Sequence, residues 1–313
     1  MQNDRKPKVT PGLESTFLVD QAGIEALFGP STQFYVPLIR EIIPWVFSAE
    51  YDFEDTNEYA EKIRNQTYTP AQANRIFWRE IIFRAHLVVS ASLYRTCRLV
   101  DASVRENQAA NLPGWASCTR ALLEATGDSS EPLRTIPRTL AEYHRWIRTC
   151  LSGQERKLTV YPELENMMIH FTHARRLRPS EKNTAPPSHK AKRTHEYISD
   201  LAAYGIPDIP ELYGELCQVS HPASDSVSYI FSPGEKEGTF RVNPRRDRES
   251  IDMLVAKYRD TFNELLMFSF NPILISLRVF HAFQLFPNIR PLRNVKFSTI
   301  PAWAEIEAAL NKR

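Results

Sequence analysis

One histidine of this chain occupies a position from which it could transfer protons. In ELYGELCQVSHPASDS, residues 211–226, Tyr213, Cys217 and His221 follow at intervals of four and share one helix face. Histidine changes its charge near neutral pH, which suits it to general acid–base chemistry. Because Pro222 disfavours helical backbone at the residue before it, we expect the helix to end on His221. The stripe also predicts that His221 points with the buried face.

The end of a helix favours the protonated form of a histidine, because unpaired carbonyl groups and the negative end of the helix dipole lie there. Two interpretations of His221 stay open. It is a general acid or base, or it only caps the last carbonyl groups over a turn. The start of the same helix is expected at Asp208, with Pro210 and Glu211 in a capping-box arrangement.

A second candidate pair is Arg120 and Glu124, four residues apart in PGWASCTRALLEAT, residues 113–126. The apolar arc of that segment runs through Trp115 and Leu122, roughly opposite the charged pair. Periodicity therefore predicts a surface ion pair, and a functional role is the alternative.

Basic side chains gather in two stretches, and either could contact phosphate groups. Four arginines of the second stretch are the candidate nucleic-acid-binding residues: Arg241, Arg245, Arg246 and Arg248. The first stretch, residues 175–193, is opposed within itself only by Glu181. Its prolines predict a flexible, solvated basic linker at residues 178–191.

Other catalytic and cofactor signatures lack support in the sequence. His170 and His173 have a helical spacing that suits a metal, but no acidic or cysteine ligand adjoins them in the motif. There is no Gly-rich phosphate loop, no Gly-x-Ser-x-Gly elbow and no His-Glu-x-x-His. The four cysteines are widely spaced and predict reduced thiols. We therefore expect neither a cofactor nor a metal.

The elements that must position these residues are mainly helices. Glycine is scarce, at 10 of 313 residues, which disfavours a sheet with many tight turns. Thr69, Pro70 and Gln72 form a capping box that opens a helix running to about residue 108. Further helices are expected at about 34–48, 56–65, 113–126, 137–152, 162–177, 192–204 and 209–220.

The hydrophobic period changes after the helix that ends at His221. SVSYIFS and GTFRV are rich in β-formers and separated by PGEKE, which predicts a hairpin at 226–242. A long helix kinked near Pro272 and a short final helix follow. The predicted fold is mainly α, a helical bundle with long central helices and one small β-hairpin inserted before the last long helix. Its predicted parts are an N-terminal helical extension (1–68), the bundle (69–286) and a C-terminal tail with a short helix (287–313).

Charge and hydropathy give further expectations. The net charge of +2 creates no global field toward nucleic acid or an anionic membrane. Polar residues interrupt the apolar stretch 265–286, which predicts a core helix and no membrane span. Because the first residues lack the apolar stretch of a secretory signal, we expect a cytoplasmic location.

SCTRALLEAT (117–126), LYGELCQVSHPAS (212–224), a hairpin and a long helix follow in that order. This order resembles a broad group of mostly uncharacterised bacterial helical proteins, HEPN-like in architecture. In them an Arg-x-x-x-Glu helix precedes a tyrosine-containing helix that ends in His-Pro. The resemblance covers roughly residues 70–285. It implies a helical bundle, often a dimer, linked in the better-known relatives to metal-independent RNA cleavage and to toxin or antiviral systems.

The chain departs from the ribonuclease pattern at one place. In those ribonucleases four to six residues separate an arginine from the histidine that follows it, and ELYGELCQVS contains no arginine. Two other pairs fit this spacing, Arg79 with His86 and Arg138 with His144. A chain so rich in arginine is expected to contain about this many such pairs by chance.

Two hypotheses of different classes remain. In the first, a composite site cleaves RNA: Arg120 stabilises developing negative charge, His221 is the general acid or base, and Tyr213 or Glu124 orients them. In the second, the chain is a non-catalytic binding or sensing module, and the same residues form a structural polar network. RNA or a protein is the expected partner in either case, and a homodimer the expected assembly.

Overall fold

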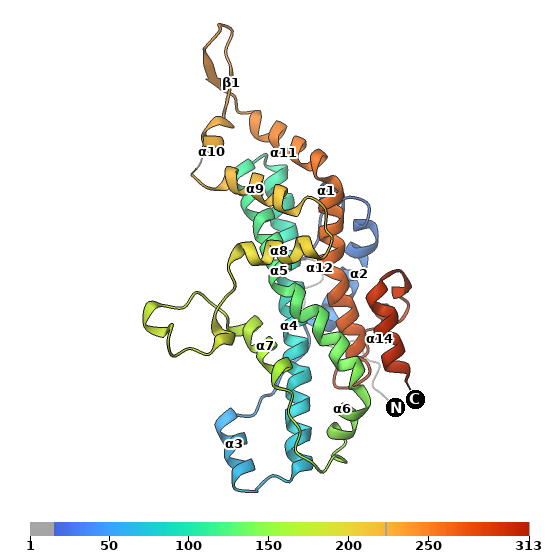
Figure 1. The fold of residues 1–313 in the computed structure, drawn as a ribbon. Helices are drawn as coiled ribbons and strands as arrows, with labels where there is room; N and C mark the ends of the chain where they lie inside the picture. The colour runs from blue at the N-terminus through green and yellow to red at the C-terminus, as the bar shows by residue number, and fades with distance from the viewer. Residues whose placement is uncertain (1–15, 223, 313) are drawn as a thin grey trace.

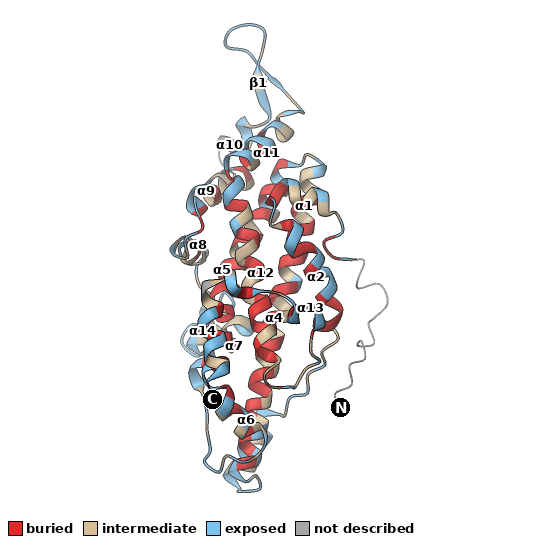
Figure 2. Cartoon of the chain, turned by 90° about the vertical axis from the view of Figure 1, so that its right-hand side faces the viewer, coloured by how far each residue is buried: buried red, intermediate tan, exposed pale blue. Residues whose placement is uncertain are grey.

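Three long helices run alongside one another and organise the protein: α4 (Pro70–Gln108), α5 (Leu112–Glu142) and α12 (Arg259–Phe280). Figure 1 shows this computed structural model, which describes residues 16–222 and 224–312. Buried residues concentrate on the facing sides of these helices (Figure 2). The predicted mainly α bundle with one small hairpin is confirmed.

α4 begins as its capping box predicts. The Thr69 hydroxyl accepts the backbone N–H of Gln72, and the Gln72 side chain accepts the N–H of Thr69 in return. Because these bonds satisfy two of the N–H groups that a helix start leaves unpaired, the capping box fixes where α4 begins. Trp78, Ile81 and Leu93 are among the side chains that α4 buries in the core.

α5 is longer than its proline content suggests. The sequence predicts helices at 113–126 and 137–152, whereas one helix runs from Leu112 through Pro132 and Pro137 to Glu142. A proline costs a helix one hydrogen bond, but both prolines are buried in the core, and their packing offsets that loss. The turn at Tyr143 then separates α5 from α6 (His144–Leu151).

The N-terminal helices share the core of the bundle. α1 (Gln21–Phe28), which the sequence did not reveal, and α2 (Thr32–Val46) bury side chains in the same apolar cluster as α4 and α12. Leu18 is fully buried, and its backbone N–H donates to the Asp101 carboxylate at 3.0 Å. This part of the predicted extension 1–68 therefore packs against the bundle.

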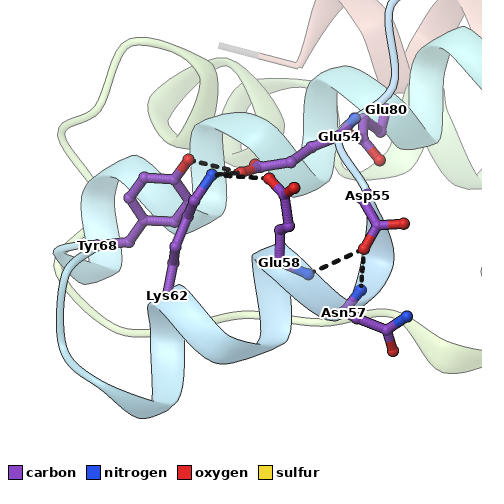
Figure 3. A network of polar contacts seen from close by, with 7 residues as sticks. All are labelled: Glu54, Asp55, Asn57, Glu58, Lys62, Tyr68 and Glu80. Carbon is purple, nitrogen blue, oxygen red and sulfur yellow. Dashed lines mark hydrogen bonds and ion pairs between the residues drawn. The ribbon is translucent and has the colours of Figure 1, made fainter.

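A polar network attaches α3 (Thr56–Arg64) to α4 (Figure 3). Lys62 and Tyr68 both donate to the Glu54 carboxylate, and the backbone N–H of Glu54 donates to Glu80 at 2.7 Å. Burial acts to raise the pKa of Glu54, but the bonds from Lys62 and Tyr68 outweigh it and lower that pKa. Asp55 caps α3, so every carboxylate named here has a structural partner.

The basic stretch after α7 (Pro162–His173), which contains the predicted linker, forms a closed loop. The backbone of Arg175 pairs with that of Lys190 in a parallel bridge, and short 3₁₀ turns occupy Pro179–Glu181 and Pro187–His189. The loop stands away from the bundle, at the left of Figure 1, and leads directly into α8 (Thr194–Ala203).

The hairpin is shorter than predicted, and a helix precedes it. α9 (Ile209–Ser220) is followed by α10 (Ser224–Ser228), where the sequence predicts strand. β1 (Phe231–Pro233) and β2 (Phe240–Val242) pair antiparallel, with Phe231 opposite Val242. The hairpin projects beyond one end of the bundle (Figure 1).

The last long helix is divided in two. Tyr258 leaves helical geometry, with φ −109° and ψ 27°, and separates α11 (Arg246–Lys257) from α12. α12 continues through Pro272, and α13 (Arg290–Arg293) and α14 (Pro301–Asn311) close the chain. Across the described ranges, no helix combines the length and the apolar character that a membrane crossing needs.

Candidate active site on helices α5 and α9

Two faces of α9 contact other helices. Leu212, Leu216 and Val219 are buried toward the core, and α9 packs along α5. On another side, the Glu215 carboxylate accepts hydrogen bonds from Lys257 and from the Tyr258 hydroxyl, which is 2.7 Å away. The break between α11 and α12 at Tyr258 thus serves to anchor α9.

The candidate residues of α5 and α9 meet in one place. The Arg120 guanidinium lies 2.6 Å from Nε2 of His221 and 3.0 Å from the Ser220 hydroxyl. Its Nε lies 3.3 Å from the Glu124 carboxylate, which also accepts the Tyr213 hydroxyl at 2.8 Å. We call these five residues the α5–α9 cluster. All four residues of the composite hypothesis belong to it.

His221 ends α9 as predicted but does not point with the buried stripe. Its backbone is extended, with φ −108° and ψ 157°, so the side chain leaves the direction that helical spacing would give it. His221 is exposed to solvent. The helix start also differs, because Asp208 adopts a left-handed conformation, with φ 53°, and its side chain does not cap.

The contact with Arg120 constrains the hydrogen bonding of His221. A guanidinium nitrogen can only donate a hydrogen bond, so Nε2 of His221 is the acceptor in this contact. An exposed imidazole can act as a general base once the lone pair on Nε2 is released.

Glu124 and Tyr213 hold the other side of the guanidinium. The side chains of Arg120 and Glu124 are 23% and 32% exposed, because this predicted surface pair faces α9. Burial, followed by the hydrogen bond to Glu124, raises the pKa of Tyr213 well above its usual value. Tyr213 therefore stays protonated and keeps donating to Glu124, which fixes the carboxylate beside Arg120.

Ser220 is a member that the sequence did not reveal. Its hydroxyl donates to the carbonyl of Leu216 at 2.8 Å and accepts from Arg120. The only sequence signal was its place in the last turn of a helix, where serine often bonds back to the preceding turn. Ser220 places the guanidinium beside His221.

The four arginines proposed for nucleic acid differ in their surroundings. Arg241 and Arg245 are exposed, on β2 and just before α11. Arg248 instead donates to the carbonyl groups of Asn107 and Gln108 at the end of α4, and Arg246 pairs with Glu249 at 3.5 Å. Two of the four therefore have structural partners.

The remaining histidines that the sequence singled out lie elsewhere. His170 bonds to the carbonyl of Ser188, and His173 stacks on His189. His86 is buried beneath Phe286. Among the residues that the structure describes, no group of three or more His, Cys, Asp or Glu side chains is placed to bind a metal.

Comparisons with family models, with curated proteins and with solved structures found no match to this chain.

Proposed function

We propose that the α5–α9 cluster is an acid–base site that cleaves RNA without a metal, in a HEPN-like helical protein. The observation that carries the proposal is the 2.6 Å contact between Arg120 and His221, two residues that come from different helices. A cation beside an exposed imidazole pairs the two groups that phosphodiester cleavage uses, namely a charge for the phosphate and a base for the hydroxyl.

Binding of a phosphodiester would release the base. A phosphate oxygen is a stronger acceptor for a guanidinium than a neutral imidazole is, because the bond is then assisted by charge on both sides. When phosphate takes the Arg120 N–H, Nε2 of His221 becomes free. It can then remove the proton of a ribose 2′-hydroxyl.

Cleavage then proceeds by attack of the 2′-oxygen. This oxygen attacks phosphorus, the bond to the 5′-oxygen breaks, and water supplies the proton for that leaving oxygen. The hydroxide left from this water takes the proton that His221 had removed, which restores the base. Arg120 stabilises the charge that builds on the non-bridging oxygens. The products are a 2′,3′-cyclic phosphate and a 5′-hydroxyl end.

A homodimer and a role as a toxin-type effector in antiviral defence belong to the same proposal, since the resemblance to HEPN-like proteins implies both. The dimer is tested by sedimentation of the full chain, with a monomer at micromolar concentration as the contrary result.

The toxin role is tested by expression of the wild type and of His221→Ala in bacterial cells, where only the wild type should slow growth.

The central experiment replaces His221 by alanine and follows cleavage of a labelled single-stranded RNA. We expect a rate loss of about 10²-fold or more, the usual contribution of a general base. The matched control is His195→Ala on α8, since His195 is equally exposed and lies outside the cluster. Arg120→Lys keeps the charge but loses the paired contacts, and it should lower the rate as well. Unchanged cleavage by folded His221→Ala protein removes His221 from the mechanism.

A second candidate is a non-catalytic module in which the cluster only locks α9 onto α5. It is favoured by the number of partners inside the cluster, because Arg120 contacts Ser220, Glu124 and His221. Here His221→Ala would lower the melting temperature, and wild-type protein would not cleave RNA. Measurement of both quantities on the same variant separates the two functions.

A further inference from the structure

The closed loop between α7 and α8 encloses a strongly basic pocket. The pocket has a volume of about 580 Å³. Five cationic side chains line it: Arg175, Arg176, Lys182, Lys190 and Arg193. The other lining residues are Leu177, Pro179 and Ala191, which supply apolar surface.

One of the five cations, Arg175, has an acidic partner within the loop. Arg175 donates two hydrogen bonds of 2.8 Å to the Glu181 carboxylate. Within residues 16–222 and 224–312, none of the other four forms an ion pair. Arg176, Lys182 and Lys190 are exposed to solvent. Four uncompensated positive charges around one cavity repel one another, and an anion placed among them relieves that repulsion.

Hydrogen bonds within the chain hold the framework of the loop. The backbone of Arg175 accepts the N–H of Ala191 at 3.1 Å and donates to His189 at 3.0 Å. Glu181 also accepts the backbone N–H of Arg178, and the bonds from Arg175 and Arg178 lower the pKa of Glu181 to about 2. Glu181 therefore stays ionised at neutral pH and holds the turn that presents Lys182.

Cations with and without an ion pair follow one another where the loop ends. Lys190 and Arg193 line the basic pocket, whereas Lys192 is not one of its lining residues and pairs with Glu131 at 2.7 Å and Asp200 at 3.3 Å. Lys192 thus has ion-pair partners, whereas four of the five cations that line the pocket have none among the described residues.

We propose that this pocket binds a run of phosphate groups. Multiple guanidinium and ammonium donors suit phosphate oxygens, and arginine can bind them in a paired geometry. A volume of about 580 Å³ has the size of an ordinary small-molecule site. The apolar floor of Leu177 and Pro179 offers a surface for a sugar or a base beside the phosphates. The phosphates come from an RNA strand or from a free polyphosphate, and the experiment distinguishes these sources.

This proposal does not rest on the proposed catalytic function. The pocket is defined by its own side chains, and phosphate binding would remain if the α5–α9 cluster had no activity. To keep the two questions apart, binding is measured with a 2′-O-methylated RNA strand, which lacks the attacking hydroxyl and cannot be cleaved by the proposed route.

The test uses the full chain with Arg176→Ala and Lys182→Ala combined. Both side chains are exposed and outside the ion pairs of the loop, so the variant should melt at the wild-type temperature. Binding of the fluorescent 2′-O-methylated strand is measured by polarisation over a range of salt concentrations, and binding of inorganic tripolyphosphate is measured separately by calorimetry. The matched control is Arg156→Ala with Lys157→Ala, which removes two exposed charges from the connection between α6 and α7.

If the ligand is an RNA strand, we expect the pocket variant to bind the strand more weakly than the wild type does, by a factor of about 10 or more. The slope of log K against log salt should fall by about 1.4, because each lost phosphate contact removes about 0.7 for a single strand. If the ligand is a free polyphosphate, the wild type binds tripolyphosphate and the pocket variant does not. In that case neither the wild type nor the pocket variant binds the strand well. Either result supports the pocket. Equal binding of both probes by the pocket variant and the control variant overturns it.

Discussion

The buried histidine of α4 predicts a measurable loss of stability in mild acid. His86 is 2% exposed, stacks on Phe286 with ring centroids 3.9 Å apart, and contacts the Tyr51 hydroxyl at 2.7 Å through Nδ1. Burial lowers the pKa of His86 from 6.5 to about 3. The folded protein therefore keeps the ring neutral between these values, whereas the unfolded chain binds a proton there.

The sign of the effect follows from proton linkage. Below pH 6.5 the unfolded state binds more protons at this site than the folded state, so the free energy of unfolding falls as the pH falls. The loss continues until the pH reaches the folded pKa of about 3. Each pH unit in this window costs up to about 1.4 kcal/mol, so acidification from pH 7 to pH 5 costs about 2 kcal/mol for this one group.

The assay is urea unfolding at pH 7 and at pH 5, for the wild type and for His86→Gln. Glutamine does not titrate, so the variant should lose about 2 kcal/mol less than the wild type over this pH change, whatever its own stability at pH 7. Use of the same protein at both pH values cancels the packing cost of the substitution. An equal loss in both proteins would refute the assignment of a neutral buried ring.

Two further predictions concern local hydrogen bonds. Thr69→Ala should destabilise the protein by about 1 kcal/mol in urea unfolding, because it removes the hydroxyl that caps α4, whereas Thr69→Ser should stay near the wild type. Tyr213→Phe and Glu124→Gln, combined in a double-mutant cycle, should show a coupling energy of about 0.5–1.5 kcal/mol for the 2.8 Å bond between them. Additive effects in that cycle would show that the bond does not contribute to the stability of the cluster.

Sequence reasoning succeeded where the local signal and the packing agree. The capping box at Thr69 fixed the start of α4, and Pro222 fixed the end of α9 at its neighbour. It was wrong where tertiary contacts override a local preference. Pro132 and Pro137 do not end α5, because both are buried in the core.

The candidate site required information that spacing along the chain cannot supply. The Arg120–His221 contact joins residues 101 positions apart, and periodicity alone placed Arg120 on a free surface and His221 on a buried one. The structure reverses both placements. α9 covers the arginine, and the extended backbone at the helix end turns the histidine outward.

The two proposed sites can also be separated by kinetics if a single RNA strand uses both. The basic pocket leads through Arg193 directly into α8, which packs against α5 and α9, the helices that carry the cluster. A contact made equally in the ground state and the transition state changes KM alone, whereas loss of the base changes kcat. Arg176→Ala with Lys182→Ala should then raise KM and leave kcat unchanged. His221→Ala should instead lower kcat and leave KM unchanged. A pocket variant that lowers kcat as much as His221→Ala does would place the pocket within the chemical step and contradict a role limited to binding.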